Sequence, residues 1–172
     1  ARRRRVGGNS RHDEAGGPGV GAVGMCLTGN FALALMVDPW LMAPVLSQPS
    51  LPFPTDAAAR RSLHVSDDDL RVIRRRTRED NVRVLGLRFT GDPLCPKARF
   101  DRLRDELGAG FEGIEIDSSL GNPYGISPFA HSVLTEALVD KAGHPTQRAL
   151  HRVLALFDEK LRAPGRSAPR HG

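Results

Sequence analysis

Four short apolar segments, each followed by a segment of helical character, constrain the fold more than any other feature of this sequence. The expected strands are residues 19–24, 41–46, 82–89 and 113–117. The expected helices are residues 27–36, 66–79, 97–107, 132–142 and a last helix with Pro145 in its first turn. Strands alternating with helices favour a parallel sheet covered by helices on both faces. We therefore expect a three-layer α/β/α fold, in which the apolar helix at 27–36 is buried.

The positive charge of the chain is confined to its two ends. The net charge is +5 over 172 residues, but residues 19–161 contain 17 basic and 18 acidic side chains. Residues 1–18 and 162–172 are rich in Gly, Pro, Ser and Arg, so we expect two disordered basic tails around one domain at 19–161. With one Tyr and one Trp to stack on bases, nucleic acid is not an expected partner.

The lengths of the apolar runs and the number of cysteines restrict the cellular compartment in which we expect the protein. The longest unbroken apolar run, Phe31–Val37, is far shorter than the ~18 residues of a membrane span, and no secretory signal is visible. Two cysteines are too few for a disulfide scaffold and suit a reducing compartment. We expect a cytoplasmic protein with no membrane partner. The histidines show no metal-ligand spacing, so no metal or other cofactor is expected.

The segment Gly24-Met25-Cys26-Leu27-Thr28-Gly29 joins the first expected strand to the first expected helix. A nucleophile on such a strand–turn–helix junction requires flanking glycines, because the turn is tight and a Cβ atom would clash. The helix N-terminus also lowers the pKa of a thiol placed there. Cys26 is therefore a candidate nucleophile; the alternative is a structural cysteine in a strand–helix corner.

Two further candidates follow later strands. Asp92 comes directly after the third strand, in Thr90-Gly91-Asp92-Pro93, and His131 follows the fourth strand and its loop. Taken singly, each is better explained as a turn or cap residue. Together with Cys26 they run in the order nucleophile, acid, histidine, each after its own parallel strand, and this is the α/β-hydrolase order. We expect all three at one edge of the sheet.

These motifs resemble the dienelactone hydrolase family of the α/β-hydrolase superfamily over residues 19–161. The resemblance rests on the Cys26 elbow, on Gly91-Asp92 with Pro96 before an amphipathic helix, and on Ala130-His131-Ser132. It implies Cys26 as nucleophile, Asp92 as acid and His131 as base. The elbow order further implies the backbone N–H of Leu27 as an oxyanion donor. The implied activity is hydrolysis of a small-molecule carboxylic ester or lactone through an acyl-enzyme.

The sequence departs from the family in two respects. Thr28 stands where the family usually has glycine. Only about 18 residues precede the elbow, so the chain is expected to lack the N-terminal strands of the fold, a second oxyanion donor and a glutamate that helps to activate the thiol in the family. The strand at 19–24 then has an open edge, which predicts self-association. The helix at 27–36 also loses neighbours, so Phe31, Leu35 and Met36 are expected to expose an apolar patch. The alternative function is a truncated, non-catalytic hydrolase remnant or interaction module.

Two other features have ordinary explanations. The arginine-rich run 71–78 closes a helix that begins with three aspartates, and this order suits the helix dipole, so we expect a solvated helix face. Cys95, close to Asp92, is expected to be a small apolar filler, with a disulfide to Cys26 as a minor alternative.

Overall fold

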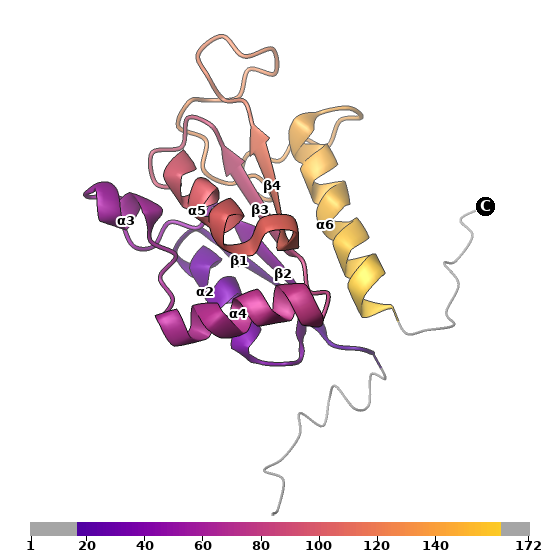
Figure 1. Ribbon diagram of the computed structural model, residues 1–172. Helices are drawn as coiled ribbons and strands as arrows, with labels where there is room; N and C mark the ends of the chain where they lie inside the picture. The colour runs from indigo at the N-terminus through magenta and orange to yellow at the C-terminus, as the bar shows by residue number, and fades with distance from the viewer. Residues whose placement is uncertain (1–16, 163–172) are drawn as a thin grey trace, which may run out of the picture.

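A computed structural model describes residues 17–162, which form a four-stranded sheet between two layers of helices (Figure 1). The strands are β1 (Val20–Met25), β2 (Leu41–Ser47), β3 (Val84–Phe89) and β4 (Phe111–Ile116). They lie in the order β1-β2-β3-β4, and every pair is parallel. The expected α/β fold is thereby confirmed. Apart from residues 17, 18 and 162, the two expected basic tails lie outside the described residues.

The helices divide the core into two parts, one on each face of the sheet. They are α2 (Gly29–Ala34), α3 (Ala57–Arg61), α4 (Asp67–Glu79), α5 (Lys97–Leu107) and α6 (Pro145–Leu161), with 3-10 turns η1 (Cys26–Thr28), η2 (Leu35–Val37) and η3 (Gly108–Gly110). Buried side chains of α2, α4 and α5 share one apolar cluster, and those of α6 share the other with the opposite sheet face. β3 lies between the two clusters, and all six of its residues are buried.

Local sequence signals set the ends of the longer helices. Ser66 caps α4, because its side chain accepts the backbone N–H of Asp69, and three aspartates occupy the first turn. Gly108 ends α5 with a positive φ of 51°, a conformation that glycine adopts without a Cβ clash. Pro145 opens α6, as expected, and the side chain of His144 accepts the N–H of Thr146.

The helix expected at 27–36 is shorter and more exposed than its apolar sequence predicts. Its regular part is six residues long and is flanked by the 3-10 turns η1 and η2. Leu33 and Met36 are buried, whereas Phe31 and Leu35 are about half exposed, at 47% and 55%. The expected burial of this helix is therefore wrong for Phe31 and Leu35, because the helix packs on the sheet through one face only. The expected exposure of an apolar patch is confirmed for Phe31 and Leu35 and is wrong for Met36.

The helix expected at 132–142 does not form. The segment consists of successive turns, including bonds from the N–H of Ala137 to Ser132 O and from Leu138 to Thr135 O. The N–H of Val139 donates to the Thr146 hydroxyl instead of to a carbonyl of its own segment. The β-branched residues of the segment also favour helix less than straight-chain residues do. The helical expectation is wrong because hydrogen bonds to α6 replace those of a local helix.

Within the arginine-rich run of α4, one side chain departs from the expected solvated face. Arg76 is 2% exposed. Its guanidinium donates to the carbonyl oxygens of Met36, Asp38 and Pro39 at 2.6–3.0 Å. Arg71 and Arg75, by contrast, are largely exposed and pair with acids on their own helix. Arg76 thus joins α4 to the chain between α2 and β2.

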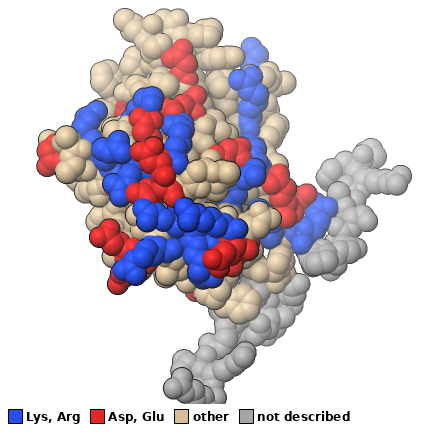
Figure 2. Space-filling model, in the orientation of Figure 1, with Lys and Arg blue, Asp and Glu red and all other residues tan. Residues whose placement is uncertain are grey.

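The helical face formed by α4 and α5 carries mixed charge. In Figure 2 basic and acidic side chains alternate over these two helices. Ion pairs across this face include Arg61 with Asp105 and Arg74 with Glu106. This alternation favours a solvated surface over a continuous basic one. Within residues 17–162, no helix has both the length and the apolar character needed to cross a membrane.

β1 is an edge strand of the described sheet, because it pairs with β2 alone. Val20, Val23 and Met25 on this strand are each at least 40% exposed. The strand has no Lys or Pro, the residues that commonly block edge pairing.

Self-association through this edge stays a prediction. Sedimentation at micromolar concentration should show oligomers that Val23→Lys reduces; a monomer for the unaltered chain would contradict it.

Replacing Arg76 tests its buried contacts. Arg76→Met leaves three carbonyl oxygens without their donor, so we expect unfolding in urea to show a loss of at least about 2 kcal/mol. Arg75→Met, on the exposed side of the same helix, should change stability by no more than about 0.5 kcal/mol. Equal losses in the two variants would show that the Arg76 contacts contribute no more than a surface ion pair.

Candidate active site

The residues that follow the four strands lie at one edge of the sheet, as expected for parallel strands. Cys26 follows β1, the segment Gln48–Ser50 follows β2, Asp92 lies three residues beyond β3, and His131 lies in the long loop after β4. Hydrogen bonds across this edge join Asp92 to His131, and they join Ser50 to both Cys26 and His131.

Cys26 occupies a tight turn between β1 and α2. Its φ is +53°, a left-handed conformation that is costly for a residue with a side chain. The two flanking glycines are required by close approach. A Cβ atom on Gly24 would lie 2.3 Å from the carbonyl oxygen of Thr28, and one on Gly29 would lie 2.5 Å from Cα of Pro49. The segment therefore has the geometry that an exposed nucleophile on a strand–helix turn requires.

Thr28, where the family usually has glycine, fits this turn and closes it. Its hydroxyl oxygen accepts the N–H of Met25 at 3.1 Å, and its O–H donates to the carbonyl of the same residue at 2.8 Å. The threonine side chain thus ties the end of β1 to the start of the helix. The departure from the family motif is compatible with the elbow.

Asp92 and His131 form a direct hydrogen bond. Nδ1 of His131 lies 2.7 Å from Oδ2 of Asp92, and the carboxylate is 1% exposed. The other carboxylate oxygen accepts the N–H of Leu94 at 2.9 Å, which fixes the orientation of the acid. Because Nδ1 donates its proton to the carboxylate, Nε2 is the ring nitrogen left to accept a proton.

A second set of bonds fixes the loops that carry these two residues. The N–H of Gly91 donates to the hydroxyl of Ser118, and the N–H of Ser118 donates to the hydroxyl of Thr90. A Cβ atom on Gly91 would lie 2.6 Å from the carbonyl of Pro128, so only glycine allows the loops after β3 and β4 to approach so closely. This approach places His131 beside Asp92.

The thiol and the imidazole alter each other's proton affinity. Burial by itself raises the pKa of Cys26, but His131, the hydroxyl of Ser50 and the N–H of Leu27 outweigh it, so the pKa lies below that of an ordinary thiol. Burial by itself lowers the pKa of His131, but Cys26 and Asp92 outweigh it, so the pKa lies above that of an ordinary histidine. Both shifts favour a thiolate beside an imidazolium.

Ser50 belongs to this site, although the sequence analysis did not select it. Its hydroxyl oxygen lies 3.3 Å from Nε2 of His131, and its backbone N–H donates to the carbonyl of Cys26 at 3.1 Å. The signal was present in the sequence, because Ser50 follows the carboxyl end of β2 just as Asp92 follows that of β3. A polar residue in a proline-rich loop is common, however, and nothing in its type distinguishes it.

A buried arginine holds the loop that carries Ser50. Arg99 on α5 is fully buried, and burial lowers the pKa of its guanidinium. It donates to the carbonyls of Pro49 and Pro52, on either side of Ser50, at 2.6 Å each. It also donates to the carbonyls of Ala59 and Ser62. All four of these hydrogen bonds run from the charged guanidinium to backbone carbonyls.

Cys95 has the opposite environment from Cys26. It is fully buried, and burial followed by the charge of Asp92 raises its pKa to about 12. Both thiols are free, so the disulfide considered for this pair is not present. Cys95 is thus a filler in the apolar core, as the sequence analysis expected.

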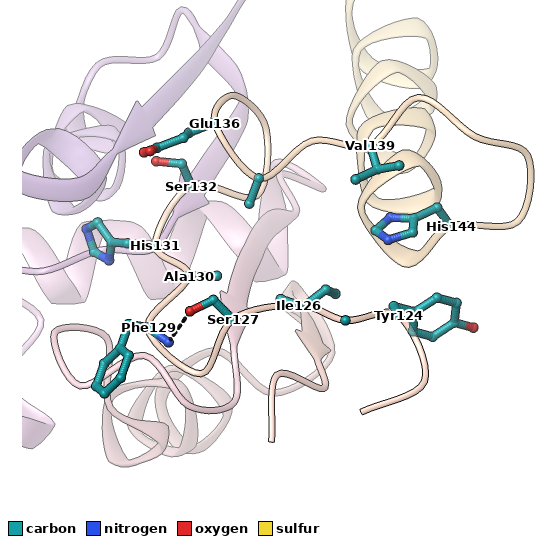
Figure 3. Close-up of a pocket in the computed structure, with 12 residues that line it drawn as sticks. Tyr124, Ile126, Ser127, Phe129, Ala130, His131, Ser132, Glu136, Val139 and His144 are labelled. Atoms are coloured by element: carbon teal, nitrogen blue, oxygen red, sulfur yellow. Dashed lines mark hydrogen bonds between the residues drawn. The ribbon is translucent and has the colours of Figure 1, made fainter. Parts of the chain in front are cut away.

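A cavity of about 400 Å³ adjoins the histidine loop. His131 is the one candidate catalytic residue among those that line it. In Figure 3 the ring of His131 points away from Tyr124, Val139 and His144, which line its other side. The cavity therefore lies behind the histidine backbone and does not open on the sulfur of Cys26.

Comparisons with known proteins add no family to this geometry. Models of known protein families, curated proteins and solved structures all give no match to the chain. In the part of the chain that the structure describes, no three His, Cys, Asp or Glu side chains are grouped as metal ligands.

The pKa shifts predict a difference between the two thiols in alkylation by iodoacetamide. A thiolate appears as the pH rises through the thiol pKa, so Cys26 should react with a midpoint below the ~8.5 of a free cysteine. Cys95 should remain unmodified at that pH. Mass spectrometry of the two cysteine peptides measures both. Equal, slow modification of the two would show that Cys26 is not activated.

Proposed function

We propose that this chain is a carboxylic ester or lactone hydrolase of the dienelactone hydrolase type. The observation that carries the proposal is the 2.7 Å bond between His131 and Asp92, formed beside a cysteine on a glycine-flanked elbow. The lowered pKa of Cys26 supports a thiolate nucleophile. With both thiols free, we also propose a reducing, cytoplasmic setting.

The first half of the reaction forms an acyl-enzyme. Nε2 of His131 takes the thiol proton of Cys26, while Nδ1 stays bound to Asp92. The sulfur attacks the ester carbonyl carbon, and the oxyanion so formed accepts the N–H of Leu27, which lies at the helix start with no intrahelical acceptor. Breakage of the carbon–oxygen bond releases the alcohol, which takes its proton from Nε2.

The second half consumes water and restores the thiol. Water attacks the thioester carbonyl and gives a proton to Nε2. The carbon–sulfur bond then breaks, the acid leaves, and the proton returns to sulfur. Leu27 supplies one donor in both tetrahedral states.

Cysteine replacement tests the nucleophile. Cys26→Ala should abolish hydrolysis of p-nitrophenyl acetate, because no other thiol reaches the elbow. Cys95→Ala should retain most of it, because that side chain only fills the core. Release of p-nitrophenol measures both. Comparable losses in the two variants would remove Cys26 from this role, and an unaltered chain without activity would favour the non-catalytic interaction module.

Replacing the acid tests the His131–Asp92 bond. Asp92→Asn keeps the shape of the side chain but no longer holds the imidazole in the tautomer that leaves Nε2 as acceptor. We expect kcat to fall by about 10³-fold or more, with an unchanged circular dichroism spectrum. Unchanged turnover in the folded variant would exclude Asp92 from the reaction.

A further inference from the structure

Ser50 lies between the two residues of the proposed thiolate–imidazolium pair. It is fully buried, its hydroxyl oxygen lies 3.3 Å from Nε2 of His131, and its backbone N–H bonds to the carbonyl of Cys26. It therefore meets Cys26 through its backbone N–H and through its hydroxyl, which helps to lower the pKa of the thiol, and it meets His131 through the same hydroxyl. Within the described residues, no other residue of the loop after β2 hydrogen-bonds to both Cys26 and His131.

The proton of the Ser50 hydroxyl already has an acceptor. The O–H donates to the carbonyl of Gln48 at 2.9 Å, and this bond alone satisfies a buried serine. The oxygen can still accept a hydrogen bond, and Nε2 of His131 lies 3.3 Å from it. Whether the O–H donates to the Gln48 carbonyl or to the sulfur of Cys26, whose pKa the hydroxyl helps to lower, the hydroxyl does not compete with a thiol or a water for the Nε2 lone pair.

The loop leaves Ser50 little freedom to move. Arg99 binds the carbonyls of Pro49 and Pro52 on either side, and Oδ1 of Asn30 accepts the N–H of Leu51. The position of the hydroxyl oxygen is thus set by backbone bonds that the reaction does not break. Such a preorganised group can bind a charge that develops in the site without rearrangement.

We propose that Ser50 is a positioning residue of the Cys26–His131 pair. Its oxygen accepts the Nε2–H of protonated His131 and keeps the ring directed at the sulfur. This matters most once the sulfur is acylated, because a thioester no longer attracts the imidazole. The catalytic meaning of this role rests on the proposed function, but the arrangement acts on the thiol whether or not an ester is hydrolysed.

Alkylation of Cys26 as a function of pH tests the proposal without a substrate. The titratable groups that act on this pair are Cys26, His131 and Asp92. Ser50→Ala removes the acceptor of the imidazolium and also the hydroxyl that helps to lower the pKa of Cys26, and with both losses the thiolate forms only at higher pH. We expect the midpoint of iodoacetamide labelling to rise by about one pH unit.

Ser47 provides a matched control. It is also fully buried and lies three residues earlier. Its hydroxyl donates to Oε1 of Gln48 and, within the described residues, forms no hydrogen bond to a proposed catalytic residue. Ser47→Ala should leave the labelling midpoint of Cys26 unchanged. If the labelling midpoint of Ser50→Ala equals that of Ser47→Ala, the proposal is overturned and Ser50 has a structural role only.

A second measurement separates the effect of Ser50 on the ring from its effect on the sulfur, and it also covers the case in which Ser50→Ala does not fold. In Cys26→Ala, with no sulfur present, the Nε2–H proton of His131 should still exchange slowly in imidazole NMR spectra at acid pH, because Ser50 holds it. Rapid exchange would overturn the proposal, even if the Ser50→Ala midpoint rises. If the unaltered chain hydrolyses no ester while the midpoint rises and this exchange is slow, the proposed function fails and this inference stands.

Discussion

The buried guanidinium of Arg99 is the interaction on which the arrangement of the site depends. It brings a positive charge into the core and satisfies it with four backbone carbonyls of the segment 49–62. Charge-assisted bonds of this kind are stronger than neutral ones, and loss of the donor would strand several buried acceptors. Arg99 itself lies on α5, just beyond the turn that carries Asp92. Arg99 therefore fastens the loop after β2 to the helix that follows the loop after β3, and His131 contacts Ser50 of the first loop and Asp92 of the second.

Patterns with a local physical cause were readable from the sequence. The buried strand β3 follows from the apolar residues on both of its faces, and the ends of α4 and α5 follow from Ser66 and Gly108. The proximity of Cys26, Asp92 and His131 followed from chain order alone, because parallel strands present their carboxyl ends at one edge. Their chemistry, in contrast, is inferred from a resemblance in a few motifs, and it is the labelling and esterase experiments that test it.

What the sequence did not reveal depends on partners far along the chain. Nothing in the type of Arg76 or Arg99 distinguishes them from the exposed arginines around them, since their burial is set by carbonyls 37–50 residues away. The failed helix at 132–142 has the same origin, because Val139 finds its acceptor on α6. Ser50 is recognisable only once His131 is placed beside it. Local propensity therefore gives the elements, while long-range polar contacts decide which polar residues enter the site.

β1 combines two separate features. Its final residue, Met25, directly precedes Cys26, the proposed nucleophile, and its outer side pairs with no strand in residues 17–162. A strand that pairs with this edge forms backbone hydrogen bonds to β1, and the end of β1 leads directly into the turn at Cys26. Association and thiol chemistry then share one stretch of chain and are thermodynamically linked. If strand pairing at this edge changes the affinity of the elbow for an acyl-like ligand by some factor, binding of that ligand changes the affinity of edge pairing by the same factor.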